Sequence, residues 1–378
     1  MSEQRYPDLT DEAIEQTRKL IGVQLRRYPR WKEAGKELII RFALAIGSRN
    51  PLYLSEELTA TNLFGTLLAH PTILSCFDDT FIAPGLPGIH ALYAGADWEF
   101  FRPILLHDRI TTTARLLDVA KKHGDFCGTM ALQTGEVVYV NQEDETVARA
   151  TSYVMRTPRD AARHRGKYMN ITRYRYSPEE LEAIDRAYEA EEIRGDVPSY
   201  WEDVQVGEQL PPIVKGPLSS DDMLNFVDIV RGTLSFSYFL DHRRRHPQDV
   251  HWDPETGMPD SWDASMVKDS VAQAFGFPFA HDSGIQRVCW LENLVTNWMS
   301  NLGFLESLKV RLVRPNFIYD TTWCRGRVVG KGVEDAKHRV ELEVWCENQR
   351  GEVTARGSAA VALVSRQVDI FPPFVHFP

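Results

Sequence analysis

Histidines and carboxylates gather in one short stretch of the second half of the chain. The segment DHRRRHPQDVH holds Asp241, His246, Asp249 and His251. An imidazole exchanges a proton near neutral pH, because its unperturbed pKa is about 6.5, and a carboxylate beside it can orient the ring. We therefore expect a general acid–base site here, with His251 as the main candidate and the other three residues as candidate partners.

The same segment also contains features that bear on metal and phosphate binding. His242 and His246 are four residues apart, a spacing that puts two ligands on one helix face. Pro247 ends any helix at that point, and the arginines between the two histidines would repel a cation, so no metal site is expected. Arg243 and Arg244 instead suit the phosphates of a ligand, with a solvated basic turn as the alternative.

The two halves of the chain repeat one another. FFRPILLHDRITTTARL in the first half corresponds to LVRPNFIYDTTWCRGRV in the second, and FGTLLAHP corresponds to FGFPFAHD. Such register indicates a duplicated fold. The matched residues at one constant offset are Arg102 and Arg314, Asp108 and Asp320, and Arg115 and Arg327. Tyr53 stands where the second copy has His251, so the second copy is expected to carry the chemistry.

Hydrophobic periodicity predicts the elements that must position these residues. Residues 285–299 have apolar side chains at three- and four-residue spacing, which indicates a buried helix. Further helices are expected at 9–21, 37–46 and 61–77, and strands at 110–119, 126–139, 146–155, 321–330, 338–347 and 352–365. A helix followed by an antiparallel sheet, twice over, is an α+β arrangement, and an edge of one sheet is expected to pair with an edge of the other.

The segment between the copies, residues 156–199, is rich in arginine and then in mixed charge. We interpret it as a solvated linker over the surface with a helix at 178–193, and a phosphate-binding arm is the alternative. The expected domains are an N-terminal one at 1–160, the charged linker at 161–198, and a C-terminal one at 199–378 that holds the candidate active site.

Composition narrows the function classes. The net charge of −10 over 378 residues argues against nucleic-acid binding. The five cysteines contain no CxxC pair, which disfavours a disulfide framework or a zinc knuckle. An acidic, polar start and the lack of an apolar run of about 18 residues predict a cytoplasmic protein with no membrane partner.

The chain resembles the MaoC-like dehydratases and R-specific enoyl-CoA hydratases, in their double hot-dog form with a FAS1-like N-terminal dehydratase domain. The resemblance rests on Asn50-Pro51-Leu52-Tyr53, on Val250-His251-Trp252-Asp253, and on the RP…D stretch in both halves. Residues 200–211 are similar to the opening strand of such domains. The resemblance implies two fused hot-dog domains, each a central helix wrapped by an antiparallel sheet, which together imitate a dimer of single domains.

Members of this family carry an Asp-x-Asn-Pro-x-His motif that delivers water across an enoyl-CoA double bond. The first copy has Ser48 and Tyr53 in the two catalytic positions, whereas the second keeps His251 but has His246 in the aspartate position. The resemblance thus implies reversible hydration at His251, with Asp241, Asp249 or His246 as its partner. No cofactor is expected apart from CoA as part of the substrate.

Other residues are assigned to binding. Ser283 and Gly284, at the start of the predicted helix at 285–299, offer free backbone amides to the thioester oxygen. Arg314 and Trp252 are expected to contact substrate, and the extra segment 256–268 to cover the site. His70, His90, His107 and His281 are interpreted as packing or surface residues.

Two other functions stay open at this point. One is a noncatalytic acyl-CoA-binding subunit of a hetero-oligomeric hydratase, which the missing aspartate favours. The other is a hot-dog thioesterase. A homodimer, or pairing with a related hot-dog subunit, is the expected assembly.

Overall fold

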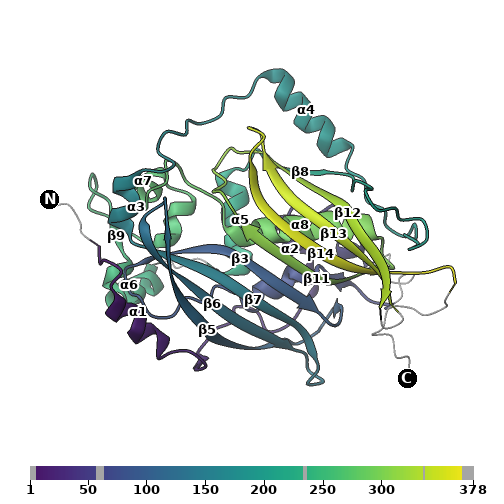
Figure 1. Ribbon diagram of the computed structural model, residues 1–378, viewed down its shortest axis with the longest axis horizontal. Coiled ribbons are helices and arrows are strands. Elements are labelled where there is room, and N and C mark those ends of the chain that lie inside the picture. Colours follow the sequence, from purple (N-terminus) through teal and green to yellow (C-terminus); the bar gives the residue numbers. More distant parts are fainter. Residues whose placement is uncertain (1–5, 57–63, 233–235, 335–336, 368–378) are drawn as a thin grey trace.

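Ten strands form one continuous antiparallel sheet that runs through both halves of the molecule (Figure 1). The computed structural model describes residues 6–56, 64–232, 236–334 and 337–367. The strand order is β1-β5-β6-β7-β3-β11-β14-β13-β12-β8. Their bounds are β1 Gln24–Leu25, β3 His90–Phe100, β5 Thr111–Gly124, β6 Gly128–Val140, β7 Thr146–Thr157, β8 Ile213–Lys215, β11 Phe304–Leu312, β12 Thr322–Glu334, β13 Lys337–Asn348 and β14 Val353–Leu363.

The two halves meet where β3 pairs with β11 in the middle of this sheet. Trp98 lies opposite Leu308, and Gly95 lies opposite Arg311. Each strand would otherwise be an open edge with unpaired backbone groups. The expected pairing between edges of the two copies is therefore confirmed, although neither β3 nor β11 was among the predicted strands.

The remaining long strands lie where hydrophobic patterning places them. In β13 the alternating residues Val340, Leu342, Val344 and Cys346 are all buried. Their neighbours are half-buried or exposed, as expected for a strand with one face on the core. The six predicted strands correspond to β5, β6, β7, β12, β13 and β14.

The central helix α8, Gly284–Met299, is buried along its whole length after its first residue. It contacts β3 and β11 at the junction as well as β12, so it packs against both halves of the sheet. The predicted helix at 285–299 is confirmed.

The first copy has no equivalent of α8 in its described residues. The prediction of a helix at 61–77 is wrong for residues 64–77, and residues 57–63 lie outside the described part. The short strand β2, Leu68–Ala69, and the 3-10 helix η3, Pro71–Cys76, stand there instead. Gly65 has a left-handed backbone and Pro71 lacks an amide hydrogen, so a continuous α-helix cannot form across this stretch.

Shorter helices surround the sheet. Thr10 caps α1, Asp11–Arg18, by accepting a hydrogen bond from the amide of Ala13. The other described helices are α2 Lys36–Ala45, η1 Pro51–Tyr53, α3 Arg159–Arg165, α4 Pro178–Glu189, α5 Ser220–Val230, α6 Phe236–Arg245, η4 Pro247–Asp249, η5 Trp262–Met266 and α7 Asp269–Ala274. α2 packs on α5, and α4 lies beside β8 (Figure 1). No described helix is long and apolar enough to cross a bilayer.

The duplication is visible in matched polar contacts. Asp108 accepts hydrogen bonds from the amide of Leu105 and from Gln142. Asp320 likewise accepts from the amide of Phe317 and from Gln349. Asp108 thus fixes the turn before β5, and Asp320 the turn before β12, each against a glutamine in the turn between the next two strands of its copy.

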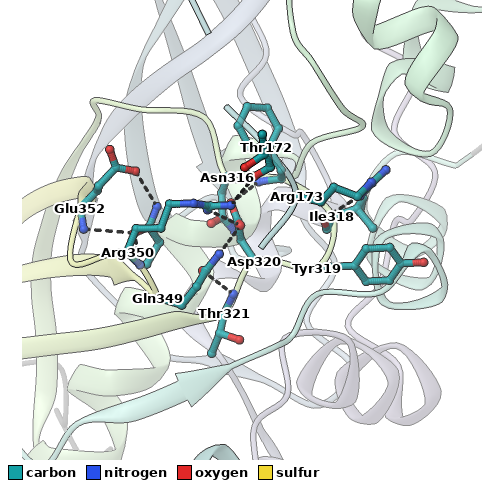
Figure 2. A network of polar contacts seen from close by, with 12 residues as sticks. Thr172, Arg173, Asn316, Ile318, Tyr319, Asp320, Thr321, Gln349, Arg350 and Glu352 are labelled. Carbon is teal, nitrogen blue, oxygen red and sulfur yellow. Dashed lines mark hydrogen bonds and ion pairs between the residues drawn. The ribbon is translucent and has the colours of Figure 1, made fainter. Parts of the chain in front are cut away.

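The second copy adds a cation to this arrangement. The Arg350 guanidinium lies 2.7 Å from Asp320 and also donates to the carbonyl oxygen of Thr172. Figure 2 shows these groups around Asp320, together with Tyr319, which precedes Asp320 in the chain, and Arg173, which follows Thr172. The network therefore joins the segment that precedes α4 in the chain to two turns of the second copy.

Two expectations about connecting segments are wrong. Residues 200–211 make isolated bridges, Tyr200 to Val364 and Gln209 to Arg327, and the opening strand β8 follows them. The interpretation of 156–199 as a solvated linker is wrong at its start, because Arg156 lies in β7, Arg159 begins α3, and both are buried. The helix predicted at 178–193 is confirmed as α4.

Candidate active site

A cavity of about 350 Å³ lies between the two halves. Strand β3 supplies His90 to Tyr93 from the first half, and the start of α8 closes it from the second. Its apolar lining includes Phe81, Leu92, Tyr93, Phe126, Met130, Met155, Trp262, Met266, Phe277, Ile285 and Leu312. A mostly apolar cavity with a few polar groups is typical of a binding site for a small molecule.

The start of α8 forms part of the cavity wall. Ser283 is the N-cap, Gly284 is the first helical residue, and both line the cavity. The first amides of a helix have no carbonyl partner within it, and the helix dipole adds positive potential there. A Cβ at Gly284 would lie 2.3 Å from Cδ1 of Leu312, so glycine permits this close packing. The predicted oxyanion residues therefore lie at the cavity.

His281 stands two residues before this N-cap and lines the same cavity. Its Nδ1 lies 3.0 Å from the carbonyl oxygen of Asp282. A carbonyl only accepts, so Nδ1 carries the hydrogen and, in the neutral ring, Nε2 keeps its lone pair. Nε2 is buried and has no partner among the described residues, and burial lowers the pKa of this imidazole. The ring is thus suited to accept a proton.

Asp282 is fixed by an ion pair beneath the cavity. Its carboxylate lies 2.6 Å from Nε of Arg287. Arg287 also donates to the carbonyl oxygens of Arg314 and Thr354, both at 2.8 Å. Burial raises the pKa of Asp282, and the guanidinium opposes that rise. This contact set fixes the turn that carries His281 and Ser283.

His90 contributes a second imidazole to the cavity. It is buried, its ring centroid is 4.4 Å from that of Phe275, and its Nε2 has no partner among the described residues. Burial lowers its pKa well below the usual value, and the nearby guanidiniums of Arg159 and Arg156 act in the same direction. A neutral ring is expected at neutral pH.

His251, the main candidate from the sequence, lies outside the lining of this cavity. It is buried in the short strand β9, His251–Trp252, which pairs with β10, Pro259–Asp260. Its Nδ1 is 3.0 Å from the Tyr6 hydroxyl, and its Nε2 has no partner among the described residues. Burial lowers its pKa. Its ring contacts Phe275, the same ring that His90 contacts.

The two copies differ in this region. In the first copy the Tyr53 and His70 rings lie 3.8 Å apart, and Glu292 hydrogen-bonds His70. In the second copy, His251 contacts Phe275, whereas His281 contacts Phe277. The segment 256–268 separates the two histidines in sequence, and through Trp262, Ser265 and Met266 it forms part of the cavity wall.

The other predicted site residues are dispersed. Asp249 lines a second cavity and accepts a hydrogen bond from the amide of Gly88 at 3.1 Å. Asp241, Arg243, Arg244 and His246 lie in or just after α6, half-buried or exposed, outside the lining of either cavity. The His246 ring packs on His242.

The predicted substrate contacts have different positions. Arg314 lines the main cavity and pairs with Glu352 at 3.4 Å. Trp252 is 42% exposed and lies outside the cavity lining. Of the binding residues predicted at the site, the structure therefore brings Ser283, Gly284 and Arg314 together.

Sequence reasoning set aside two histidines that line the cavity. His281 belongs to the repeated Ala-His pair and stands just before the predicted helix, a signal that would have placed it at the helix start. His90 has no comparable signal, because it lies in β3, which the sequence did not predict.

Comparisons with known proteins agree with this fold. Residues 19–150 match the model of the FAS1-like dehydratase domain region. A 3-hydroxybutyryl-CoA dehydratase from Methylorubrum extorquens is 28% identical over 88 residues, which cover 23% of this chain and 56% of the relative. The chain thus spans little more than half the length of that curated relative.

Solved structures extend the likeness to the whole chain. A MaoC-like dehydratase superposes with a TM-score of 0.62 at 15% identity, covering 91% of this chain and 99% of the other. A conserved hypothetical protein from Mycobacterium tuberculosis with a double hot-dog fold gives 0.52 at 10% identity, covering 89% and 94%. The first half therefore matches the FAS1-like dehydratase region, and the chain as a whole has the double hot-dog fold seen in a MaoC-like dehydratase.

Proposed function

We propose that this protein is a hydratase or dehydratase that adds or removes water at the 2,3 double bond of an enoyl-CoA in the main cavity. The observation that carries the proposal is that the start of α8 and His281 line one apolar cavity, and that Nε2 of His281 has no partner among the described residues. The matched 3-hydroxybutyryl-CoA dehydratase supports the same class of reaction.

In hydration, the thioester oxygen accepts hydrogen bonds from the amides at Gly284 and Ile285, which stabilise the negative charge that develops there. Nε2 of His281 removes a proton from water, and the water oxygen bonds to C3. The electron pair of the double bond moves toward the thioester, and C2 then takes the proton from the imidazolium. The ring returns to its neutral form, and dehydration is the reverse.

The role predicted for His251 stays a prediction beside this one. Its Nε2 is buried without a partner among the described residues, as is that of His281. The reaction class is the same with either base. The two assignments differ in the residue whose loss removes turnover.

The test follows the loss of enoyl-thioester absorbance with trans-2-enoyl-CoAs of increasing chain length. Wild type is expected to turn over, and His281→Ala to lose about 100-fold or more in kcat, as is typical when a general base is removed. Melting curves check that each variant is folded. Loss in His251→Ala but not in His281→Ala would transfer the base role to His251.

Two results would contradict the proposed reaction. Tight binding of acyl-CoA without turnover at any chain length or pH would identify a binding subunit. Release of free CoA with no addition of water to the double bond would identify a thioesterase.

A further inference from the structure

A second cavity of about 330 Å³ adjoins the main one. The two share Phe81, His90, Ala91 and Trp262 in their walls, so they lie on either side of a common partition. The second cavity differs in chemistry, because its lining includes Arg156, Arg159 and Asp249.

Arg159 is the distinctive group in this lining. It is 2% exposed, and its guanidinium carbon lies 4.5 Å from the ring centroids of both Tyr6 and Phe275. Its Nε and Nη1 have no hydrogen-bond partner among the described residues. A buried charge normally has hydrogen-bonded partners, because the desolvation of an unpaired ion is costly. The Tyr6 side chain hydrogen-bonds this guanidinium, so Nε and Nη1 are the groups whose hydrogen-bonding capacity is left for a ligand.

Two of the neighbouring cations are already engaged, and a third, Arg26, lies exposed at the rim of the lining. Arg156 donates hydrogen bonds to the carbonyl oxygens of four residues in the loop before β3, namely Ala83, Gly85, Leu86 and Ile89, and to Gln133. Arg27, at another part of the wall, is paired with Asp78 and Asp79.

Asp249 is the carboxylate in this lining, and it interacts electrostatically with both Arg156 and Arg159. Asp160 also acts on Arg159 but is paired with Arg163 at 3.2 Å, so three guanidiniums share two carboxylates and a positive balance remains. Asp249 also accepts from the amide of Gly88, so part of its hydrogen-bonding capacity is used there. The second cavity suits one further anion.

We infer that Arg159 binds a carboxylate on the acyl group of the substrate, so that the preferred substrates are enoyl thioesters of dicarboxylic acids. This inference rests on the proposed function. A planar guanidinium matches a carboxylate with paired hydrogen bonds. We place this carboxylate on the acyl group because the second cavity shares wall residues with the main one, in which the acyl chain is proposed to lie.

The experiment compares kcat/KM for two trans-2-enoyl-CoAs of equal length, one ending in a carboxylate and one in a methyl group. Wild type is expected to prefer the carboxylate, and Arg159→Met to lower the ratio of the two values by about 10- to 100-fold, as expected for charged hydrogen bonds. Arg159→Lys keeps the charge but not the paired geometry and should retain part of the preference. Arg149→Met, at an exposed arginine of β7, is the matched control and should leave the ratio unchanged.

Pantetheine thioesters, which lack the nucleotide phosphates, separate the two sources of anion. If Arg159 binds the acyl carboxylate, the lowered ratio persists with them. An equal loss for both acyl groups in the CoA series that disappears with pantetheine would assign Arg159 to the phosphates and overturn the inference. Absence of a carboxylate preference in wild type would overturn it as well.

Equilibrium binding separates failure of the inference from failure of the proposed function. Saturated acyl-CoAs with and without the terminal carboxylate are titrated calorimetrically into wild type and Arg159→Lys. If no substrate is turned over but the carboxylated ligand binds more tightly and loses that advantage in the variant, the carboxylate site stands and the hydratase proposal fails. Equal binding of both ligands to wild type overturns the site.

Discussion

The lack of a Cβ at Gly284 allows the start of α8 to pack closely against Leu312 and Tyr93. Replacement by alanine would put a carbon 2.3 Å from Leu312 and 3.3 Å from Tyr93. We expect Gly284→Ala to displace the first turn of α8, with a loss of about 100-fold in kcat and about 1–3 kcal/mol in stability. Steady-state kinetics and urea unfolding measure the two effects.

Gly332→Ala is the control for that variant, because a Cβ at Gly332 meets nothing within 4 Å. It should match wild type in kcat and unfold at nearly the same urea concentration. Wild-type kcat in a folded Gly284→Ala protein would show that the amides of this turn are not used in catalysis.

The buried imidazoles predict a pH dependence. Because burial lowers the pKa of His281, the ring gains its proton only at a pH below the ordinary value of about 6.5. As a base it is active when neutral, so kcat/KM for hydration should hold from neutral pH down to about 6.5 and decline below it. A profile measured with the uncharged pantetheine thioester avoids titration of the substrate. A decline that begins above neutral pH would exclude this ring as the base.

Residues near helix ends were predictable from the sequence, and residues placed by tertiary contacts were not. Ser283 and Gly284 follow from the start of a periodic apolar segment, which fixes where free amides occur. Arg159 lies in an arginine-rich stretch whose composition favours solvent exposure. Its burial depends on Tyr6 and Phe275, which are far from it in the sequence.

At the scale of the elements, Asp108 and Asp320 fix equivalent turns in the two copies, so the contribution of the same carboxylate contact to stability can be compared with and without a paired arginine. Both accept a backbone amide and a glutamine, but Asp320 also pairs with Arg350. We expect Asp320→Ala to cost about 3 kcal/mol and Asp108→Ala about 1–2 kcal/mol, because only the former leaves a guanidinium without its carboxylate. Urea unfolding of both variants gives the difference. Equal losses would mean that the Arg350 contact adds nothing to stability.

The pairing of β3 with β11 leaves no room for a side chain at Gly95. This residue has φ +134°, and a Cβ there would lie 2.0 Å from the carbonyl oxygen of Val310 in β11. Gly95→Ala is expected to cost about 3 kcal/mol or more, since it combines backbone strain with a collision between the paired strands. Circular dichroism during thermal unfolding measures the loss.

Gly35→Ala is the matched substitution for Gly95→Ala. Gly35 precedes α2 with φ −70°, and a Cβ there meets nothing within 4 Å. This variant should melt within a few degrees of wild type. A Gly95→Ala protein as stable as the control would show that the two halves tolerate separation at this point.

The elements that the sequence predicted are those with a clear period of their own. The period of α8 and the alternation in β13 identify them. β3 was not predicted because it contacts β7, β11 and α8, so buried and exposed residues do not alternate regularly along it. The helix expected at 61–77 shows the opposite error: apolar composition suggested a helix where Pro71 prevents one.

For the whole molecule, one hydrophobic cluster includes buried residues of both halves, from Phe42 and Trp98 to Trp298 and Val340. Neither half closes a core alone, so we expect a single cooperative unfolding transition. Tryptophan fluorescence and far-ultraviolet circular dichroism in urea should give the same midpoint. Two separated transitions would show that each half is stable by itself.

The β3–β11 pairing joins two related units within a single polypeptide. In an assembly of two identical chains, every substitution occurs at both symmetric positions, so a change that improves one wall of a cavity also alters its twin. Here each position changes independently. His70 packs on Tyr53 and hydrogen-bonds the carboxylate of Glu292 from the second copy, whereas His281, the counterpart of His70, lines the main cavity. Covalent fusion thus allows an asymmetric ligand to be matched by an asymmetric protein surface.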